Sequence, residues 1–224
     1  MAAETAIDRI LGYFFGQKAL QKGGRGHCRR RRADRFRSAV ATSIHISKAC
    51  NNPMPKPPSH YDAIILGAGG AGLMCAAVAG QRGRKILLID HADEPGKKIL
   101  ISGGGRCNFT NIGTAPDRYL SQNKHFAKSA LSGYTASDFI ALVDRYGIDW
   151  HEKTLGQLFC DGSAKQIVAM LMNECPADSV SLSLGKAITA VSHSDGRYRV
   201  EYGGQTAFAP SLVVATGGPS IPKM

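Results

Sequence analysis

The sequence has no long hydrophobic run, no CxxC pair and only one tryptophan. A membrane-spanning helix needs about 18–20 apolar residues in succession, so a helical membrane protein is excluded. The six cysteines, at positions 28, 50, 75, 107, 160 and 175, show none of the spacings typical of zinc or thioredoxin sites. We therefore expect reduced thiols in a cytoplasmic protein, and no metal site.

Acidic residues are scarce, and the shortage is local. The chain holds 28 Lys and Arg against 17 Asp and Glu, a formal charge of +11. Residues 1–53 account for 11 of the basic and 3 of the acidic residues, so the rest of the chain is nearly balanced. The arginine run at residues 29–32 leaves open a protein that associates with nucleic acid. It lacks interleaved aromatic residues, which favours a solvated leader with no specific nucleic-acid partner and no membrane partner.

Residues 1–57 are predicted to form this basic, disordered leader. They show neither a secretory pattern nor the acid-poor composition of a mitochondrial transit peptide. Met54 stands just before a proline-rich stretch and the first predicted strand. Our hypothesis is that Met54 is the native initiator, and N-terminal sequencing of the native protein would test it.

The first clear fold motif runs from residue 63 to residue 90. An apolar run at residues 63–66 predicts a buried parallel strand, and the sequence GAGGAG follows at residues 67–72. Residues 73–81 then predict a helix and residues 85–89 a second strand, which ends at Asp90. A strand, a GxGxxG turn, a helix, a strand and an acid in this order predict a dinucleotide-binding βαβ unit.

Each part of this motif has a physical role. We expect Gly67 to permit the tight turn, Gly69 to let the backbone approach a pyrophosphate, and Gly72 to let helix and strand pack closely. The helix N-terminus offers free N–H groups to the phosphates. Asp90 is placed to accept hydrogen bonds from a ribose diol, which favours FAD or NAD over NADP.

A second glycine-rich segment distinguishes FAD from NAD. Residues 95–111 read PGKKILISGGGRCNFTN, which is unlike the third strand of an ordinary dehydrogenase. Three consecutive glycines expose bare backbone and suit close approach to a ligand. A plain polar surface loop is the alternative interpretation of this segment.

The runs YDAIILGAGGAGLMCA, GRKILLID and PGKKILISGGGRCNFTN resemble the BaiN/YhiN-like flavoproteins, also called the aminoacetone oxidase family. The resemblance covers about residues 60–224 and implies a bacterial FAD-dependent oxidoreductase of the two-dinucleotide-binding type. Family members commonly carry Glu where this chain has Asp90. The resemblance implies FAD contacts for Gly67, Gly69, Ala71, Gly72, Asp90, Lys97, Lys98, Ser102, Gly103, Gly104, Gly105, Arg106, Asn108, Ile188, Ala215, Thr216 and Gly217.

The remaining elements complete a nucleotide domain around an insertion. Capping boxes predict helices that begin after Thr135 and Ser163, and Asp195-Gly196 predicts a hairpin turn. Cys107 has no histidine partner in the pattern and is expected to be a packing residue. Short strands are predicted at residues 180–184, 187–192, 197–202, 206–209 and 211–215, the last leading into the ATG turn at residues 215–217.

We predict an α/β fold, namely a Rossmann-like FAD-binding domain that is truncated at its C-terminus relative to the family. Its two segments are residues 58–115 and 179–224, and a small helical insertion occupies residues 116–178. The implied function is hydride transfer through FAD to or from a small organic substrate, with NAD(P)H as a candidate electron donor. No catalytic residue is assigned. A catalytically inactive nucleotide-binding fragment and an NAD-dependent dehydrogenase are the alternatives.

Overall fold

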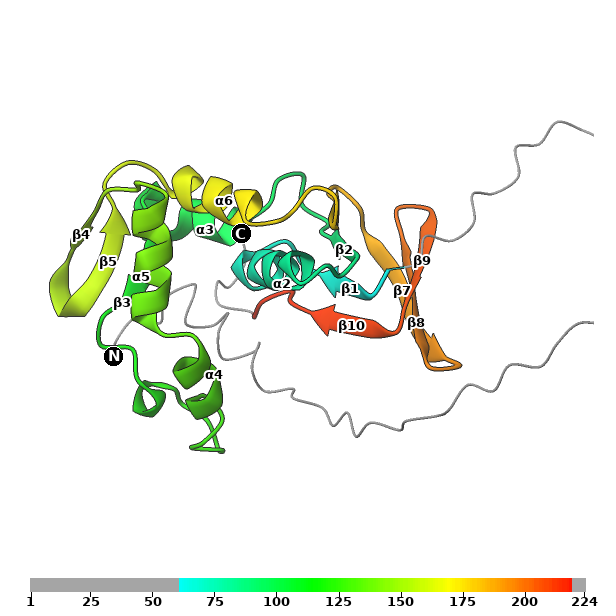
Figure 1. Ribbon diagram of the computed structural model, residues 1–224, viewed down its shortest axis with the longest axis horizontal. Helices are drawn as coiled ribbons and strands as arrows, with labels where there is room; N and C mark the ends of the chain where they lie inside the picture. The colour runs from blue at the N-terminus through cyan, green and yellow to red at the C-terminus, as the bar shows by residue number, and fades with distance from the viewer. Residues whose placement is uncertain (1–60, 219–224) are drawn as a thin grey trace, which may run out of the picture. The chain divides into compact units, whose positions relative to one another are not determined.

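A computed structural model describes residues 61–218 of the chain. The predicted leader and the hypothesis about Met54 lie outside the described residues. Within them, the chain forms a four-stranded sheet, two three-stranded sheets and a set of helices (Figure 1). Among these residues no helix has the length and apolar character needed to cross a bilayer.

The central sheet is entirely parallel and has the strand order β10-β1-β2-β6. Its strands are β1 (Ala63–Leu66), β2 (Ile86–Ile89), β6 (Val180–Ser183) and β10 (Ser211–Val214), which confirms the predicted strands. The chain moves from β1 to β2 on one side and returns to β10 on the other. In such sheets, ligands bind outside the carboxyl ends of the strands where the order reverses, which here lies between β1 and β10.

Helix α2 (Gly70–Gln81) joins β1 to β2 and begins three residues earlier than the predicted residue 73. The glycines of the motif therefore form the first turn of the helix as well as the loop. Small residues on the buried side of α2, including Ala76 and Gly80, allow the helix to pack closely. Gly80 in particular has Val180 and Pro176 side chains where a Cβ would stand, at 2.8 and 2.9 Å.

The two faces of the parallel sheet carry different cores. Ile65 and Leu88 face the helices, while Ile64, Leu66 and Leu87 face a second, smaller cluster. This alternation follows from the two-residue repeat of a strand. The smaller cluster is completed by buried residues of an antiparallel sheet made of β7 (Ile188–Ser194), β8 (Arg197–Tyr202) and β9 (Gln205–Ala209). The parallel sheet is thus covered by helices on one face and by strands on the other.

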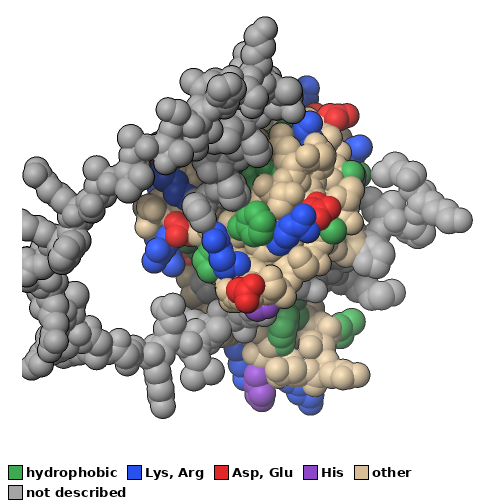
Figure 2. Space-filling view, turned by 90° about the vertical axis from the view of Figure 1, so that its right-hand side faces the viewer, with side chains coloured by type: hydrophobic (Ala, Val, Ile, Leu, Met, Phe, Trp, Pro, Cys, Tyr) green, Lys and Arg blue, Asp and Glu red, His purple; other side chains and the backbone are tan. Residues whose placement is uncertain are grey.

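The antiparallel sheet β7–β8–β9 is built as the sequence predicted. Asp195 and Gly196 both have positive φ, at 51° and 71°, as a two-residue hairpin turn requires. On the side of the molecule seen in Figure 2, Lys and Arg side chains are interspersed with Asp and Glu rather than gathered by sign. On β8, for example, Arg199 forms an ion pair with Glu201.

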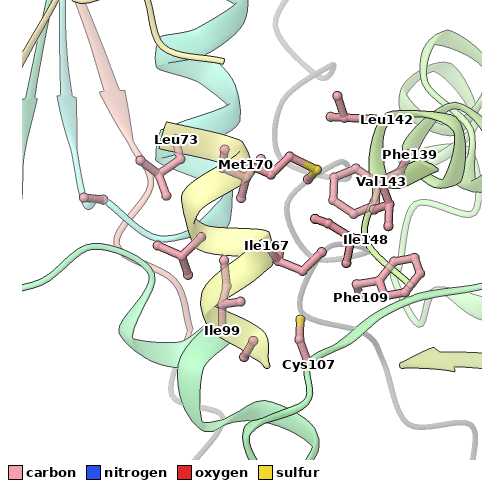
Figure 3. Packing of buried hydrophobic residues seen from close by; sticks show 14 of the residues in the cluster. Leu73, Ile99, Cys107, Phe109, Phe139, Leu142, Val143, Ile148, Ile167 and Met170 are labelled. Carbon is pink, nitrogen blue, oxygen red and sulfur yellow. The ribbon is translucent and has the colours of Figure 1, made fainter. Parts of the chain in front are cut away.

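The capping boxes confirm both predicted helices. In α5 (Ala136–Arg145) the Thr135 side chain accepts from the Asp138 N–H, and the Asp138 carboxylate accepts from the Thr135 N–H at 2.7 Å. In α6 (Ala164–Asn173) Ser163 and Gln166 form the equivalent reciprocal pair. Helix α6 then lies between the Rossmann part and α5, with Ile167 and Met170 in the shared core (Figure 3).

Several short elements were not predicted from the sequence. The segment expected to be helical contains α4 (Lys128–Gly133), but also β4 (Trp150–Glu152) and β5 (Gln157–Cys160), which form an antiparallel sheet with β3 (Asn108–Asn111). Each strand has three or four residues, too few for a visible two-residue repeat. The five-residue helix α3 (Lys97–Ile101) lies in a segment for which no helix was predicted. The boundaries of the insertion itself stay a prediction.

Candidate dinucleotide-binding site

The turn after β1 is held by contacts between backbones. Gly67 has a φ of +103°, and its N–H donates to the Ile89 carbonyl at 2.7 Å. A Cβ on Gly67 would lie 2.5 Å from the Ala215 carbonyl oxygen, and a Cβ on Gly72 would lie 1.8 Å from the Gly67 oxygen. Two glycines of the motif are therefore required by the close packing of β1, β10 and α2.

Gly69 differs from these two because a Cβ there would meet no atom within 4 Å. It is the N-cap of α2, with no side-chain capping bond and no acidic residue in the first turn among the described residues. The first N–H groups of a helix carry positive partial charge and bind anions. An open approach to this helix end fits a pyrophosphate, and the residues present therefore suit a dinucleotide.

Asp90 links the strand ends rather than standing free. Its carboxylate accepts from the Ala68 N–H at 2.6 Å and from the Ala92 N–H at 2.9 Å. The Asp90 carbonyl also accepts from the Lys186 N–H at 3.0 Å. Asp90 thus fixes the loop after β1. Its Oδ1 atom also lies 3.3 Å from His91 Nδ1, whereas Oδ2 retains capacity for one further donor, such as a ribose hydroxyl.

The second glycine segment is a loop in left-handed backbone conformation. Gly103, Gly104 and Gly105 have φ values of 56°, 67° and 84°. A Cβ on Gly103 would lie 2.6 Å from the Phe159 ring, whereas a Cβ on Gly104 would meet nothing within 4 Å. The loop therefore rests on Phe159 on one side and is open at Gly104.

The predicted residues around this loop lie on three short elements. Lys97 and Lys98 are exposed on α3, and the Lys98 ammonium donates to the Gly218 carbonyl at 3.2 Å. Ser102 donates through its hydroxyl to the Ile99 carbonyl at 2.8 Å. Arg106 is exposed, and Asn108 begins β3 opposite Phe159. The Lys98 bond connects α3 with the segment that follows β10.

The ATG turn lies beside the first glycine motif. The Ala215 N–H donates to the Leu66 carbonyl at 2.8 Å, Thr216 is exposed, and Gly217 has a φ of +78°. Ile188 is half-buried at the start of β7, two residues after the Lys186 that bonds to Asp90. The ends of β1, β2 and β10 are thus directly bonded to one another. Ile188 packs against the smaller cluster on the other face of the parallel sheet.

Sequence reasoning missed two supports of the site. Gly96, with a φ of +69°, donates its N–H to the Ala68 carbonyl at 2.8 Å, and a Cβ there would lie 2.7 Å from Val168. Its place after Pro95 is the signal that could have found it, since Pro-Gly marks a turn. Phe159, the support of the glycine loop, carries no comparable signal.

The thiols and the histidines of the described part offer no metal site. Cys75, Cys107, Cys160 and Cys175 are free, and no group of three or more potential ligands occurs among residues 61–218. Burial raises the pKa of Cys107 to about 11, so this thiol is protonated near neutral pH. Cys107 is fully buried and packs in the core, as predicted.

Comparison with known proteins agrees with this geometry. The profile of the HI0933-like protein Rossmann domain matches residues 61–224. The chain belongs to the HI0933-like family. This is the family of flavoproteins that the sequence resembles, and the predicted Rossmann-like FAD-binding fold is confirmed.

Two relatives within this comparison share one name. The ribosomal RNA dihydrouridine synthase of Escherichia coli is 55% identical over 164 residues, covering 73% of this chain and 41% of the relative. That of Haemophilus influenzae is 47% identical over 169 residues, covering 74% of this chain and 42% of the relative. The HI0933-like chain therefore spans less than half the length of these curated relatives.

A solved structure supports the fold alone. Sdh1 of Mycobacterium smegmatis, solved in complex with UQ1, aligns with a TM-score of 0.52 at 19% identity. The alignment covers 71% of this chain and 34% of Sdh1. At this low identity, the similarity shows that the two proteins share an arrangement of strands and helices, and it shows nothing about ligands.

Proposed function

We propose that this chain is the FAD-binding N-terminal part of an oxidoreductase that reduces uridine in ribosomal RNA to dihydrouridine. The observation that carries the dinucleotide site is the open Gly69 at the uncapped N-terminus of α2, at the reversal point of the parallel sheet. The second glycine segment, open at Gly104, and the family of flavoproteins support FAD over NAD. The relatives named as ribosomal RNA dihydrouridine synthases support the substrate. We propose this substrate in place of the small organic molecule expected from the sequence.

In this proposal the chain's own residues bind and orient the dinucleotide. Gly69 and the first turn of α2 receive the pyrophosphate, Asp90 receives the adenosine ribose, and the loop around Gly104 approaches the flavin. When bound, FAD supplies the hydride chemistry that reduction of a uracil ring needs. NAD(P)H is the proposed electron donor that keeps the flavin reduced. The catalytic proton donor is not assigned to any residue of this chain.

Purified protein tests the FAD assignment. The 224-residue chain should bind FAD, seen as quenching of flavin fluorescence, and ADP should compete because it occupies the same pyrophosphate and ribose positions. A chain that binds ADP but leaves FAD free would support the alternative of a nucleotide-binding fragment. Failure of a folded chain to bind either molecule would contradict the site.

A chimera tests the substrate separately. Residues 61–224 replace the matching segment of the Escherichia coli relative, in cells that lack the native gene. We expect the chimera to contain flavin and to restore dihydrouridine in ribosomal RNA, measured by nucleoside mass spectrometry. A chimera that carries flavin but leaves the uridines unreduced would contradict the proposed activity of this segment while leaving the FAD site intact.

A further inference from the structure

Two cysteines that are 53 positions apart in the sequence come together in the small sheet. Cys107 directly precedes β3 and Cys160 ends β5, and these strands are antiparallel with Asn108 opposite Phe159. The Cys160 N–H donates to the Arg106 carbonyl at 3.1 Å. Cys107 therefore lies between two residues that are joined to β5, namely Arg106, which is bonded to Cys160, and Asn108, which is paired with Phe159. This places Cys107 opposite Cys160.

Both thiols lie on the same face of this sheet. Cys160 shares the core cluster with Leu158, and Cys107 shares it with Phe109, while Phe159 lies outside this cluster. Cys107 and Cys160 are each 0% exposed, and Figure 3 shows the Cys107 side chain directed into the core near Ile167. Facing residues of an antiparallel pair have Cβ atoms about 4.5–5.5 Å apart. Cys107 lies one residue before the paired part of β3 and has a φ of +56°, so closure to the spacing of a disulfide requires a local shift of its backbone.

We propose that Cys107 and Cys160 form an oxidisable thiol pair that closes to an intramolecular disulfide when hydrogen peroxide reaches it. The oxidant must be small and uncharged because both sulfur atoms are buried. The deprotonated Cys107 sulfur attacks one peroxide oxygen, which breaks the O–O bond and gives a sulfenic acid and, after protonation, water. The Cys160 thiol then attacks the sulfenic sulfur, and the S–S bond forms as a second water leaves. Two thiols and one peroxide thus give one disulfide and two waters.

The disulfide would act on the candidate site through the backbone. Cys107 already has a φ of +56° and directly follows the loop that contains Gly103, Gly104 and Gly105. A bond from Cys107 to β5 would fix the end of this loop to the strand that carries Phe159. The oxidised protein should therefore hold the loop more rigidly than the reduced one.

The reactivity of the pair should depend strongly on pH. Burial raises the pKa of Cys107 to about 11, and burial together with the neighbouring Cys107 raises that of Cys160 to about 12. Since the thiolate is the species that reacts, the rate should rise about tenfold per pH unit below these values.

The test uses the chain with C28S and C50S, which leaves four cysteines, and measures intact mass and disulfide-linked peptides after peroxide treatment. We expect the loss of two hydrogen atoms and one crosslink between the Cys107 and Cys160 peptides. C107S and C160S should each abolish the crosslink, and C175S should leave it unchanged. Stable sulfinic acid at Cys107 without a crosslink, or a crosslink between other cysteines, would overturn the proposal.

A second readout needs no cysteine substitution in the sheet. Trp150 is the only tryptophan of the chain and pairs with Cys160 across β4 and β5. Peroxide should change its fluorescence at the rate at which the crosslink appears, and a reductant should reverse both changes. Crosslink formation with no change at Trp150 would place the disulfide outside this sheet.

Discussion

The two glycine-rich segments of the chain meet their surroundings in different ways. In the first, Gly67 and Gly72 are pressed against backbone atoms of the fold, whereas Gly69 faces open space. In the second, a Cβ on Gly103 would meet an aromatic ring first and one backbone nitrogen at 3.0 Å, and Gly104 is open. The first segment therefore joins structural and ligand-facing glycines within six residues, while the second is a loop whose shape depends on its own φ angles and on one aromatic ring.

Among the substitutions that test this comparison, Gly72→Ala should cause the largest loss of stability. In Gly72→Ala the new Cβ would stand 1.8 Å from the Gly67 carbonyl oxygen, and neither backbone can move without disturbing the sheet. We expect a loss of at least about 3 kcal/mol in the free energy of unfolding, measured with urea. A stable Gly72→Ala protein would show that the contact between α2 and the loop is not tight.

Removal of the Asp90 carboxylate should lower the free energy of unfolding by somewhat less than Gly72→Ala does. Asp90→Ala leaves the Ala68 and Ala92 N–H groups without the acceptor that each has in the structure. Losing two such bonds should lower the free energy of unfolding by about 2–3 kcal/mol. Asp117→Ala, at an exposed site, is the control and should change little. Equal effects at both positions would contradict the linking role of Asp90.

Within the second segment, Gly103 and Gly104 can be compared directly. Both have left-handed φ angles, so either alanine substitution should cost about 1–2 kcal/mol. Gly103→Ala should cost more because its Cβ also meets the Phe159 ring. Adding Phe159→Leu to Gly103→Ala should recover part of that excess, and no recovery in the urea denaturation curves would rule out the ring contact as its cause.

The smallest effect belongs to the cap of α5, far from either glycine segment in the sequence. Thr135→Ala should lower the free energy of unfolding by about 1 kcal/mol. Hydrogen bonds from the backbone N–H and the side chain of Thr135 lower the pKa of Asp138. The pKa of an Asp carboxyl in the unfolded chain is about 3.9. Because the pKa of Asp138 is lower in the folded protein, its carboxylate stabilises the fold at pH values above about 3.9, and this stabilisation is lost as the pH falls through the folded pKa.

The pH dependence has its own control. Asp138→Asn removes the titrating group. The free energy of unfolding of the wild type should therefore exceed that of this variant at pH 7, and the difference should vanish in acid. Urea denaturation of both proteins across this range measures the difference. An advantage that persists below the folded pKa would contradict the assignment to the Asp138 carboxylate.

The sequence predicted most of the fold wherever a pattern spanned enough residues. The run at residues 63–90 contains a strand, a helix and a second strand with the glycines at fixed spacing, and all three elements were found. The caps at Thr135 and Ser163 were found because they are local side-chain chemistry. The small sheet of β3, β5 and β4 could not be predicted, because each strand has only three or four residues. In addition, β3 pairs with β5 across about fifty positions of the sequence.

The site was predictable to a similar degree. The order of strands, which brings Ala215 against Gly67, follows from the two glycine-containing turns once a Rossmann-like fold is assumed. The contact of Phe159 with Gly103 does not, since nothing in the sequence around Phe159 marks it as a support. The bonds from Ala68 and Ala92 to Asp90 were also hidden, because a terminal acid is equally suited to a ligand or to the backbone.

The central claim is that the open end of α2 at Gly69 binds the pyrophosphate of FAD. Gly69 has an extended backbone that any residue can adopt, at φ −74° and ψ −174°. The most direct test is calorimetric titration of FAD and ADP into the wild type and Gly69→Glu. We predict an unfolding free energy within about 0.5 kcal/mol of the wild type, with affinity for both ligands reduced at least tenfold. A folded Gly69→Glu protein that binds FAD as tightly as the wild type would contradict the site.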